Sequence, residues 1–447
     1  MGQGESGRAD RPMARPLLAC LVTALLSGCL DQGGGGGVAR MLMPDPAPVG
    51  EGLGAGVQGA ETSVVLDDLM ARRSALQRGS VLDRVAGAVL VADTRAAQAE
   101  LRSARLRARA QSRNWLPSIG PQASLSSLGS VVAMLVVEQV LFDNGRKLAE
   151  RDFAKADVEV AAVSLVQDSN DRVLTALTLY LAVREAQDKA VLAQDAERDM
   201  AHFEWIMSER VAGGISDQSD LQVLRQKLAE IRATGQTETE AARAALAELS
   251  AMGVGAEHLA DQHAIAPLHL PAPMPVPLPV RLAEAEQSRA EARARVERAG
   301  FLPSLTATGA LGRGASDPSL DLRTARPLGF GAGDDLRAIE AATEGERRKV
   351  DQAREETNRR LRRLEQEQTA LMRQAAEATV LASRAKANLD LFQSQYDAGQ
   401  RQVMDVVGLY EQFARQQQSV AALRYRAALT ELQVAAALGL LADGDKL

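Results

Sequence analysis

The sequence predicts a mainly α-helical fold with a small β part, built as a tandem repeat of long antiparallel helical hairpins plus β-hairpins. Composition is the first reason: aromatic residues make up 3% and hydrophobic residues 46%, a mix that suits long helices packed side by side. The second reason is a repeat. The turn Arg210–Asp220 is echoed by Gln395–Asp405, and Trp115–Ser118 is echoed by Phe301–Ser304. Both pairs keep an offset of about 185 residues, which indicates a duplicated domain.

The totals exclude several classes of protein. A net charge of −6 is too mild for a nucleic-acid-binding protein. The chain has four histidines and no metalloprotease, serine-hydrolase or phosphate-loop motif, so we expect no enzyme, no cofactor and no metal site. His258, His263 and His269 lie in or near a proline-rich segment without paired ligands, and we expect them to be solvated.

The N-terminus has the pattern of a secretory signal. Residues 1–28 contain a basic Arg15, the apolar run Leu17–Leu26 and small residues before Cys29, with translation starting at Met13. Leu26-Ser27-Gly28-Cys29 is similar to the lipobox of bacterial lipoproteins, which implies that Cys29 is lipidated and begins the mature chain. The alternative is an ordinary signal with an unrelated cysteine. Residues 29–63 are rich in Gly and Pro and are interpreted as a flexible, lipid-anchored tether.

Residues 64–265 form the first repeat. We expect helix over Val64–Asn114, in two pieces broken near Gly79. Pro117 ends this helix, and Ser118–Phe142 changes to a strand-like pattern that turns near Gly129. Each strand has about 10 to 12 residues, the length that a tilted membrane-spanning strand needs. A buried hairpin is the alternative.

The longest helices follow. Asp143-Asn144-Gly145 is a turn signal, after which helix is expected from Arg146 to about Val211 and again over Asp220–Met252. Val166, Val173 and Tyr180 recur every seven residues and indicate a coiled-coil-like seam. Short connections favour antiparallel neighbours, so Arg210–Asp220 is the tip of a long hairpin.

Residues 266–280 are a proline-rich linker, and residues 281–441 repeat the plan. We expect helix over Arg281–Gly300, a β-hairpin within Ser304–Gly331, and helices from Asp335 to Tyr396 and from Asp405 to about Leu441. Proline and glycine interrupt the second hairpin, which predicts that it is short or irregular.

Turn chemistry accounts for part of each tip. Gly214 and Gly399 are expected to supply a positive φ at a helix C-terminus. Asp220 and Asp405 are expected to cap the returning helices. Arg210 is the tip residue that this turn chemistry explains least.

These features together resemble the TolC-like outer-membrane efflux protein family. The sequence Leu141-Phe142-Asp143-Asn144-Gly145-Arg146 resembles the step from strand to long helix in that family. Leu116-Pro117 and Leu302-Pro303 resemble its step from helix to strand. The tips match through Arg210, Gly214, Ser219 and Asp220 in the first repeat and Tyr396, Gly399 and Asp405 in the second. The chain departs from the pattern at Val211, Gln395, Met404 and Pro327–Gly331.

The resemblance implies a passive outer-membrane channel, the duct of a tripartite efflux or type I secretion system. Three copies would form one tube: a twelve-strand β-barrel in the outer membrane continued by an α-helical barrel across the periplasm. The tips would dock a periplasmic adaptor protein that connects the tube to an inner-membrane pump. Two alternatives stay open: a periplasmic adaptor, and a lipid-anchored coiled-coil scaffold without a pore.

Overall fold

The computed structural model describes residues 63–92, 96–126, 130–255, 258–259, 265, 267–312, 318–326 and 329–446. All of them belong to one compact unit, Leu53–Leu447. The predicted signal sequence, Cys29, the tether up to residue 62, the expected hairpin turn at Gly129 and His263 lie outside the described residues.

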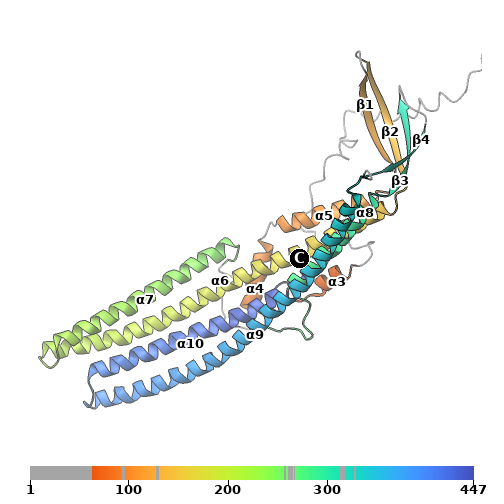
Figure 1. Ribbon diagram of the computed structural model, residues 1–447. Helices are drawn as coiled ribbons and strands as arrows, with labels where there is room; N and C mark the ends of the chain where they lie inside the picture. Colours follow the sequence, from red (N-terminus) through yellow and green to blue (C-terminus); the bar gives the residue numbers. More distant parts are fainter. Residues whose placement is uncertain are drawn as a thin grey trace, which may run out of the picture. The chain divides into compact units, whose positions relative to one another are not determined.

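Both halves of the chain have the same order of elements: short helix, two β-strands, a very long helix and a returning helix (Figure 1). The first half holds α3 (Val64–Ala71), α4 (Val81–Val91), α5 (Ala96–Ser112), β1 (Ser118–Ser126), β2 (Ser130–Phe142), α6 (Arg146–Ala212) and α7 (Gln218–Ala251). The second half holds α8 (Leu278–Ala299), β3 (Pro303–Gly312), β4 (Ser319–Thr324), α9 (Ala332–Asp397) and α10 (Val403–Ala437), followed by a short 3-10 turn, Gly444–Lys446.

The helices form a layer in which α6 and α9 are the long members. They have 67 and 66 residues, which corresponds to about 100 Å each at 1.5 Å per residue. Toward the tips the order across the layer is α7, α6, α10, α9; toward the sheet it is α5, α6, α8, α9. The predicted seam is confirmed, because Val166, Val173 and Tyr180 are buried on α6.

The N-terminal helical region divides into three helices rather than two. Gly79 has φ +75°, and the Ser80 hydroxyl accepts the Asp83 N–H at 3.2 Å, so α4 starts anew after this turn. α4 ends at Val91 with Ala92 as its C-cap, and α5 starts at Ala96. The predicted break near Gly79 is wider than periodicity indicated, because no helix forms between Ala71 and Val81.

The C-terminal segment after α10 packs against the helices in the middle of the layer. α10 ends at Ala437, short of the predicted Leu441, because Gly439 takes φ +69° and turns the chain. Leu440, Leu441 and Ala442 beyond it are buried, and the Leu441 N–H donates to Asn170 Oδ1 of α6 at 2.8 Å. The buried Arg72 guanidinium donates to the Leu438 carbonyl at 2.7 Å. The Leu438 carbonyl and the Leu441 N–H are thereby paired inside the core.

The segment between the repeats runs without helix or strand from residue 267 to Pro277, as its prolines predict. It is nevertheless attached to the core: the His269 N–H donates to the Ala75 carbonyl at 2.9 Å. α8 starts at Leu278, three residues before the predicted Arg281, because proline is tolerated in the first turn of a helix.

The four strands form one antiparallel sheet in the order β1-β2-β3-β4. The sheet joins the two repeats, since β2 pairs with β3 from Met134↔Gly312 to Phe142↔Leu305. β1 and β4 are its edges. β4 has only 6 residues against 9, 13 and 10 in β1, β2 and β3, which confirms the prediction of a short second hairpin. Among the described helices, none is both long and apolar enough to cross a membrane.

Candidate functional site

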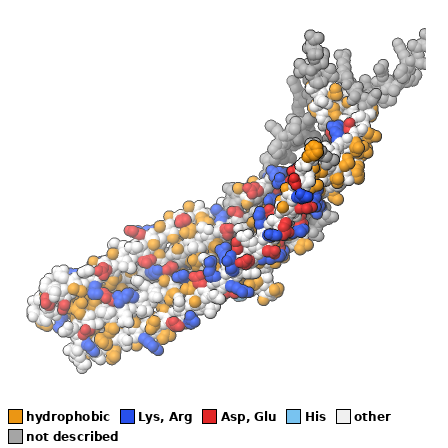
Figure 2. Space-filling model, in the orientation of Figure 1, with side chains coloured by type: hydrophobic (Ala, Val, Ile, Leu, Met, Phe, Trp, Pro, Cys, Tyr) orange, Lys and Arg blue, Asp and Glu red, His pale blue; other side chains and the backbone are white. Residues whose placement is uncertain are grey.

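The sheet has one apolar face. Residues directly opposite in an antiparallel ladder share a face, so the register assigns the paired strand residues to one side or the other. The apolar face carries Ile119, Pro121, Leu135, Val137, Leu305, Ala307, Leu311, Leu320 and Leu322, with Gln139, opposite Ala307, as a polar exception. Five of these side chains, Ile119, Leu135, Leu311, Leu320 and Leu322, are exposed. Figure 2 shows hydrophobic side chains over much of the visible part of the sheet beside a few acidic and basic ones, whereas acidic and basic side chains are spread all along the helices.

The opposite face is polar on β1, β3 and β4 and mixed on β2. It carries Ser118, Gln122, Glu138, Ser304, Thr306, Thr308, Ser319, Asp321 and Arg323. Hydrogen bonds link some of these groups, for example from Thr308 Oγ1 to Asp321 Oδ2 at 3.3 Å. The sheet can therefore face an apolar phase on one side and water on the other.

The predicted steps between strands and helices come together at the base of the sheet. The Asp143 carboxylate accepts the N–H groups of Gly145 and Lys147 at 3.1 and 2.7 Å, which caps the start of α6. Asn144 and Gly145 have φ +54° and +81°. The Asn144 side-chain amide donates to the Pro303 carbonyl at 2.8 Å. A strand-to-helix step of one repeat is thus bonded to a helix-to-strand step of the other.

Both tips have the same backbone geometry. Gly214 and Gly399 have φ +70° and +75°, as predicted. The N–H of the residue after each glycine bonds to the carbonyl five residues earlier, Ile215 to Arg210 and Gln400 to Gln395, both at 2.8 Å. These bonds, with those of the glycines themselves, make a Schellman motif at each helix end.

The caps of the returning helices differ from the prediction at the first tip. Asp217 is the N-cap of α7, and its carboxylate accepts the Ser219 N–H at 3.1 Å; Asp220 lies in the first turn instead. At the second tip Asp405 lies in the equivalent first turn and accepts the Gln402 N–H in a capping box, so it caps α10 as expected.

Arg210, the tip residue that turn chemistry was expected to explain least, also takes part in the turn. Its Nε donates to Ser216 Oγ at 3.1 Å. At the second tip Gln395 is equivalent to Arg210, and Arg401 is equivalent to Ser216. These two residues are also bonded, since Arg401 Nε donates to Gln395 Oε1 at 3.0 Å. The Arg401 guanidinium also lies over the Phe392 ring, 4.4 Å from its centroid.

No motif or periodicity pointed to Ile215, which lies at the first tip. The residue that follows the glycine of a Schellman motif usually packs back on its helix. Ile215 is instead 69% exposed, and the second tip has Gln400 at this position. Ser219 and Tyr396 lie beside the turns, exposed and half-buried respectively.

A shared core holds the two tips together. Side chains of all four long helices meet in it: Met200, Phe203, Met207, Leu221, Leu224, Leu228, Leu389, Val403, Val406, Val407 and Tyr410. Polar contacts surround this core. The Tyr410 hydroxyl of α10 donates to Asp199 Oδ2 of α6 at 2.6 Å, and Lys227 of α7 pairs with Glu411 of α10. Burial, followed by the hydrogen bond to Asp199, raises the pKa of the Tyr410 hydroxyl above its usual 10.0.

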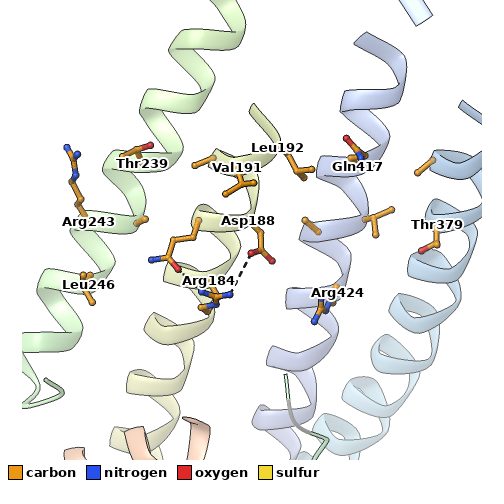
Figure 3. Close-up of a pocket in the computed structure, with 16 residues that line it drawn as sticks. Arg184, Asp188, Val191, Leu192, Thr239, Arg243, Leu246, Thr379, Gln417 and Arg424 are labelled. Atoms are coloured by element: carbon orange, nitrogen blue, oxygen red, sulfur yellow. Dashed lines mark hydrogen bonds and ion pairs between the residues drawn. The ribbon is translucent and has the colours of Figure 1, made fainter. Parts of the chain in front are cut away.

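Farther along the layer, a groove of about 880 Å³ lies across α6, α7, α9 and α10. Figure 3 shows Arg184 and Asp188 of α6 facing one another, with Arg243 on α7 and Arg424 on α10 to either side. The Tyr425 hydroxyl donates to Asp188 Oδ2 at 2.6 Å. Four helices contribute to this groove, so no single stretch of sequence predicted it. Among the described residues, no group of three or more His, Cys, Asp or Glu side chains could hold a metal ion.

No protein-family model matches the sequence, and no curated protein matches it. Solved structures do match the fold. A membrane protein from Pseudomonas aeruginosa has a TM-score of 0.70 at 16% identity, over 88% of this chain and 96% of that one. The outer membrane protein VceC from Vibrio cholerae has a TM-score of 0.66 at 17% identity, over 80% and 96%. The MtrE outer membrane channel of Neisseria gonorrhoeae, in its open state, has a TM-score of 0.64 at 17% identity, over 82% and 91%.

At these identities the comparisons establish the fold: mostly helical with a small antiparallel sheet, as in the outer-membrane channels that it matches. The fold predicted from the repeat is therefore confirmed.

Proposed function

We propose that this protein is the outer-membrane channel component of a tripartite efflux or type I secretion system. Three copies form one passive duct that crosses the outer membrane and the periplasm, and the tips dock a periplasmic adaptor linked to an inner-membrane pump. The observation that carries the proposal is the two-faced sheet, which continues directly into a layer of helices about 100 Å long.

The sheet supports the membrane part of the proposal. Membrane-spanning strands alternate between residues that face lipid and residues that face the lumen. The apolar face of this sheet has that alternation, and its exposed leucines would be unfavourable in water. A scaffold or adaptor without a pore does not require an exposed apolar face on four strands.

The edges of the sheet support assembly. Open strand edges are not tolerated in lipid, because every backbone N–H and C=O needs a partner there. β1 and β4 are open edges in a single chain. Three copies with four strands each close the sheet into the twelve-strand barrel implied by the resemblance, with β4 of one copy beside β1 of the next.

The helical layer supports the same assembly. On α9, the middle of the helix buries one residue in seven: Val350, Thr357, Leu364, Leu371, Ala378 and Ala385. A helix with so narrow a buried stripe leaves wide faces for other contacts and for water. α9 is one border of the layer, and α5 and α7 are the other. Copies arranged in a ring bring these borders together, with water inside and outside the tube.

The tips support docking. Turn geometry accounts for Gly214, Gly399, Asp405 and the backbone of both turns. It does not use the exposed side chain of Ile215. Apolar side chains surrounded by polar groups are common anchors of protein interfaces, so this surface suits an adaptor.

For localisation, we propose that Cys29 is lipidated and anchors the protein at the outer membrane, with the helices extending into the periplasm. A lipid chain contributes about 0.8 kcal/mol per buried methylene, which supplements the membrane contact of the sheet. Intact-mass analysis of the mature protein tests this: lipid mass on the N-terminal cysteine is expected, and Cys29→Ser should remove it. An unmodified wild-type chain would contradict the lipid anchor.

Val136 and Val137 provide a matched test of the membrane part. They are adjacent residues of the same type on β2, opposite Ala310 and Gly309, and they lie on opposite faces. We expect a fluorophore on Val137→Cys to be quenched by lipids that carry a nitroxide on the acyl chain. The same fluorophore on Val136→Cys should be quenched by water-soluble iodide. Equal quenching of both by iodide would contradict insertion of the sheet in lipid.

A further inference from the structure

The two repeats place equivalent residues at the junction between sheet and helices. α6 starts at Arg146 and α9 at Ala332, so Asn144 and Phe330 each stand two residues before a long helix. Trp115 and Phe301 each stand two residues before a proline that starts or precedes a strand, Pro117 and Pro303.

Within one chain, the two repeats contact each other at one such junction. Asn144 of the first repeat donates its amide to the carbonyl of Pro303 in the second repeat at 2.8 Å. Beside this junction, Phe301 is only 6% exposed. The Arg326 guanidinium lies over its ring, 5.3 Å from the centroid. The junction therefore combines a covered aromatic ring with a contact to the neighbouring repeat.

The equivalent residues beside the two edge strands of the sheet are exposed. Within the described part of the chain, Phe330 is fully exposed and Trp115 is 57% exposed, although it is the counterpart of Phe301. β1, which follows Trp115, and β4, which precedes Phe330, are the two edges of the sheet. Both aromatic rings thus lie where a further repeat would be added.

We propose that Phe330 of one copy packs against Trp115 and Pro117 of the next copy, and that this aromatic contact is a principal determinant of assembly between copies. The inference rests on the proposed ring of three copies. In such a ring, Phe330 meets the helix-to-strand step of the next copy in the way that Asn144 meets Pro303 within the chain.

The change from asparagine to phenylalanine fits the difference between the two junctions. Within the chain, covalent connection already holds the repeats together, and a single hydrogen bond is sufficient to set their register. Between copies, association must overcome the loss of translational and rotational freedom. Burial of two aromatic rings offsets part of that cost, and aromatic residues are enriched among the residues that dominate interface energies.

Cross-linking tests the contact. Trp115→Cys with Phe330→Cys, treated in the outer membrane with a short bis-maleimide, should give covalent dimers and trimers but nothing larger, because a head-to-tail ring closes. The control is Trp205→Cys with Phe330→Cys: Trp205 is 59% exposed but lies about 90 Å along α6 from its start. Phe330→Cys alone measures background coupling through Cys29.

The outcomes separate this inference from the proposed function. Light scattering of each variant in detergent gives the number of copies independently. A trimer in which the Trp115/Phe330 pair links no better than the Trp205/Phe330 pair would overturn the aromatic contact and leave the channel intact. A monomer would overturn both. Phe330→Ala should lower the temperature at which the trimer dissociates, whereas Trp205→Ala should leave it unchanged; equal effects would also overturn the contact.

Discussion

Arg210 and Ser216 are joined across the first tip by a hydrogen bond of 3.1 Å, and at the second tip the same two positions are occupied by Gln395 and Arg401, joined at 3.0 Å. The arginine is the first residue of the bonded pair at the first tip and the second residue at the second tip, and the hydrogen bond is present at both. Both tips therefore use this contact to hold the turn, and each presents one guanidinium, from opposite sides of the turn.

The first prediction separates the turn contact from docking at Arg210. Ser216→Ala removes the hydrogen bond and keeps the cation, whereas Arg210→Gln removes the cation and leaves an amide that can still bond to Ser216. We expect Ser216→Ala to retain export and Arg210→Gln to reduce it severalfold. The measurement is complementation of a strain that lacks the gene, scored by sensitivity to a panel of exported compounds, with immunoblots of the outer membrane. Equal export by both variants would exclude a docking role for the cation.

The second prediction concerns Ile215. Ile215→Gln copies the residue that the second tip has as Gln400, so the turn geometry should be kept. Because the side chain is exposed, the variant should reach the outer membrane at wild-type level with unchanged stability. Export should fall if Ile215 contacts the adaptor. Wild-type export in the same complementation assay would show that the docking surface lies elsewhere.

The third prediction uses two glycines of α10 and its turn. Gly399 has φ +75°, and an added methyl group would meet no atom within 4 Å, so only backbone strain opposes alanine there. Gly399→Ala should cost about 1–2 kcal/mol in free energy of unfolding. Gly408 is exposed inside α10 without a positive φ, and Gly408→Ala should instead gain about 0.5–1 kcal/mol. Opposite shifts of the chemical denaturation midpoint are expected; shifts of the same sign would contradict the turn geometry.

The fourth prediction concerns pH. Burial and the bond to Asp199 raise the pKa of Tyr410 in the folded protein above its usual 10.0. A folded state with the higher pKa binds the proton more tightly, so this stabilisation is complete below about pH 10 and is lost as the pH rises further. Tyr410→Phe should therefore melt at a lower temperature than wild type at pH 8, because it leaves Asp199 without the hydroxyl, at a cost of about 1–3 kcal/mol. The difference should shrink at pH 11; a difference that is constant from pH 8 to 11 would contradict the raised pKa.

Much of the fold could be read from the sequence because its signals are local and repeated. The proline-free runs gave the two long helices to within a few residues, and the Leu-Pro-Ser steps marked where helix changes to strand. Gly214 and Gly399 carried the tip geometry, since few other residues adopt a positive φ.

The misses have equally local causes. The first tip offers Asp217, Ser219 and Asp220 as possible caps, and only the backbone, extended at Asp217, decides among them. Gly439 was a stop signal for α10 that the apolar residues after it concealed. No local pattern predicts the pairing of β2 with β3 or the groove across four helices, because both depend on contacts between distant segments.

The most direct test of the channel is to count the copies and measure conductance in one preparation. The protein is extracted from outer membranes in detergent, weighed by light scattering and added to a planar lipid bilayer. We predict a mass of three chains and discrete ion-conducting steps. A monomer or dimer that stays electrically silent would contradict the channel and favour a scaffold without a pore.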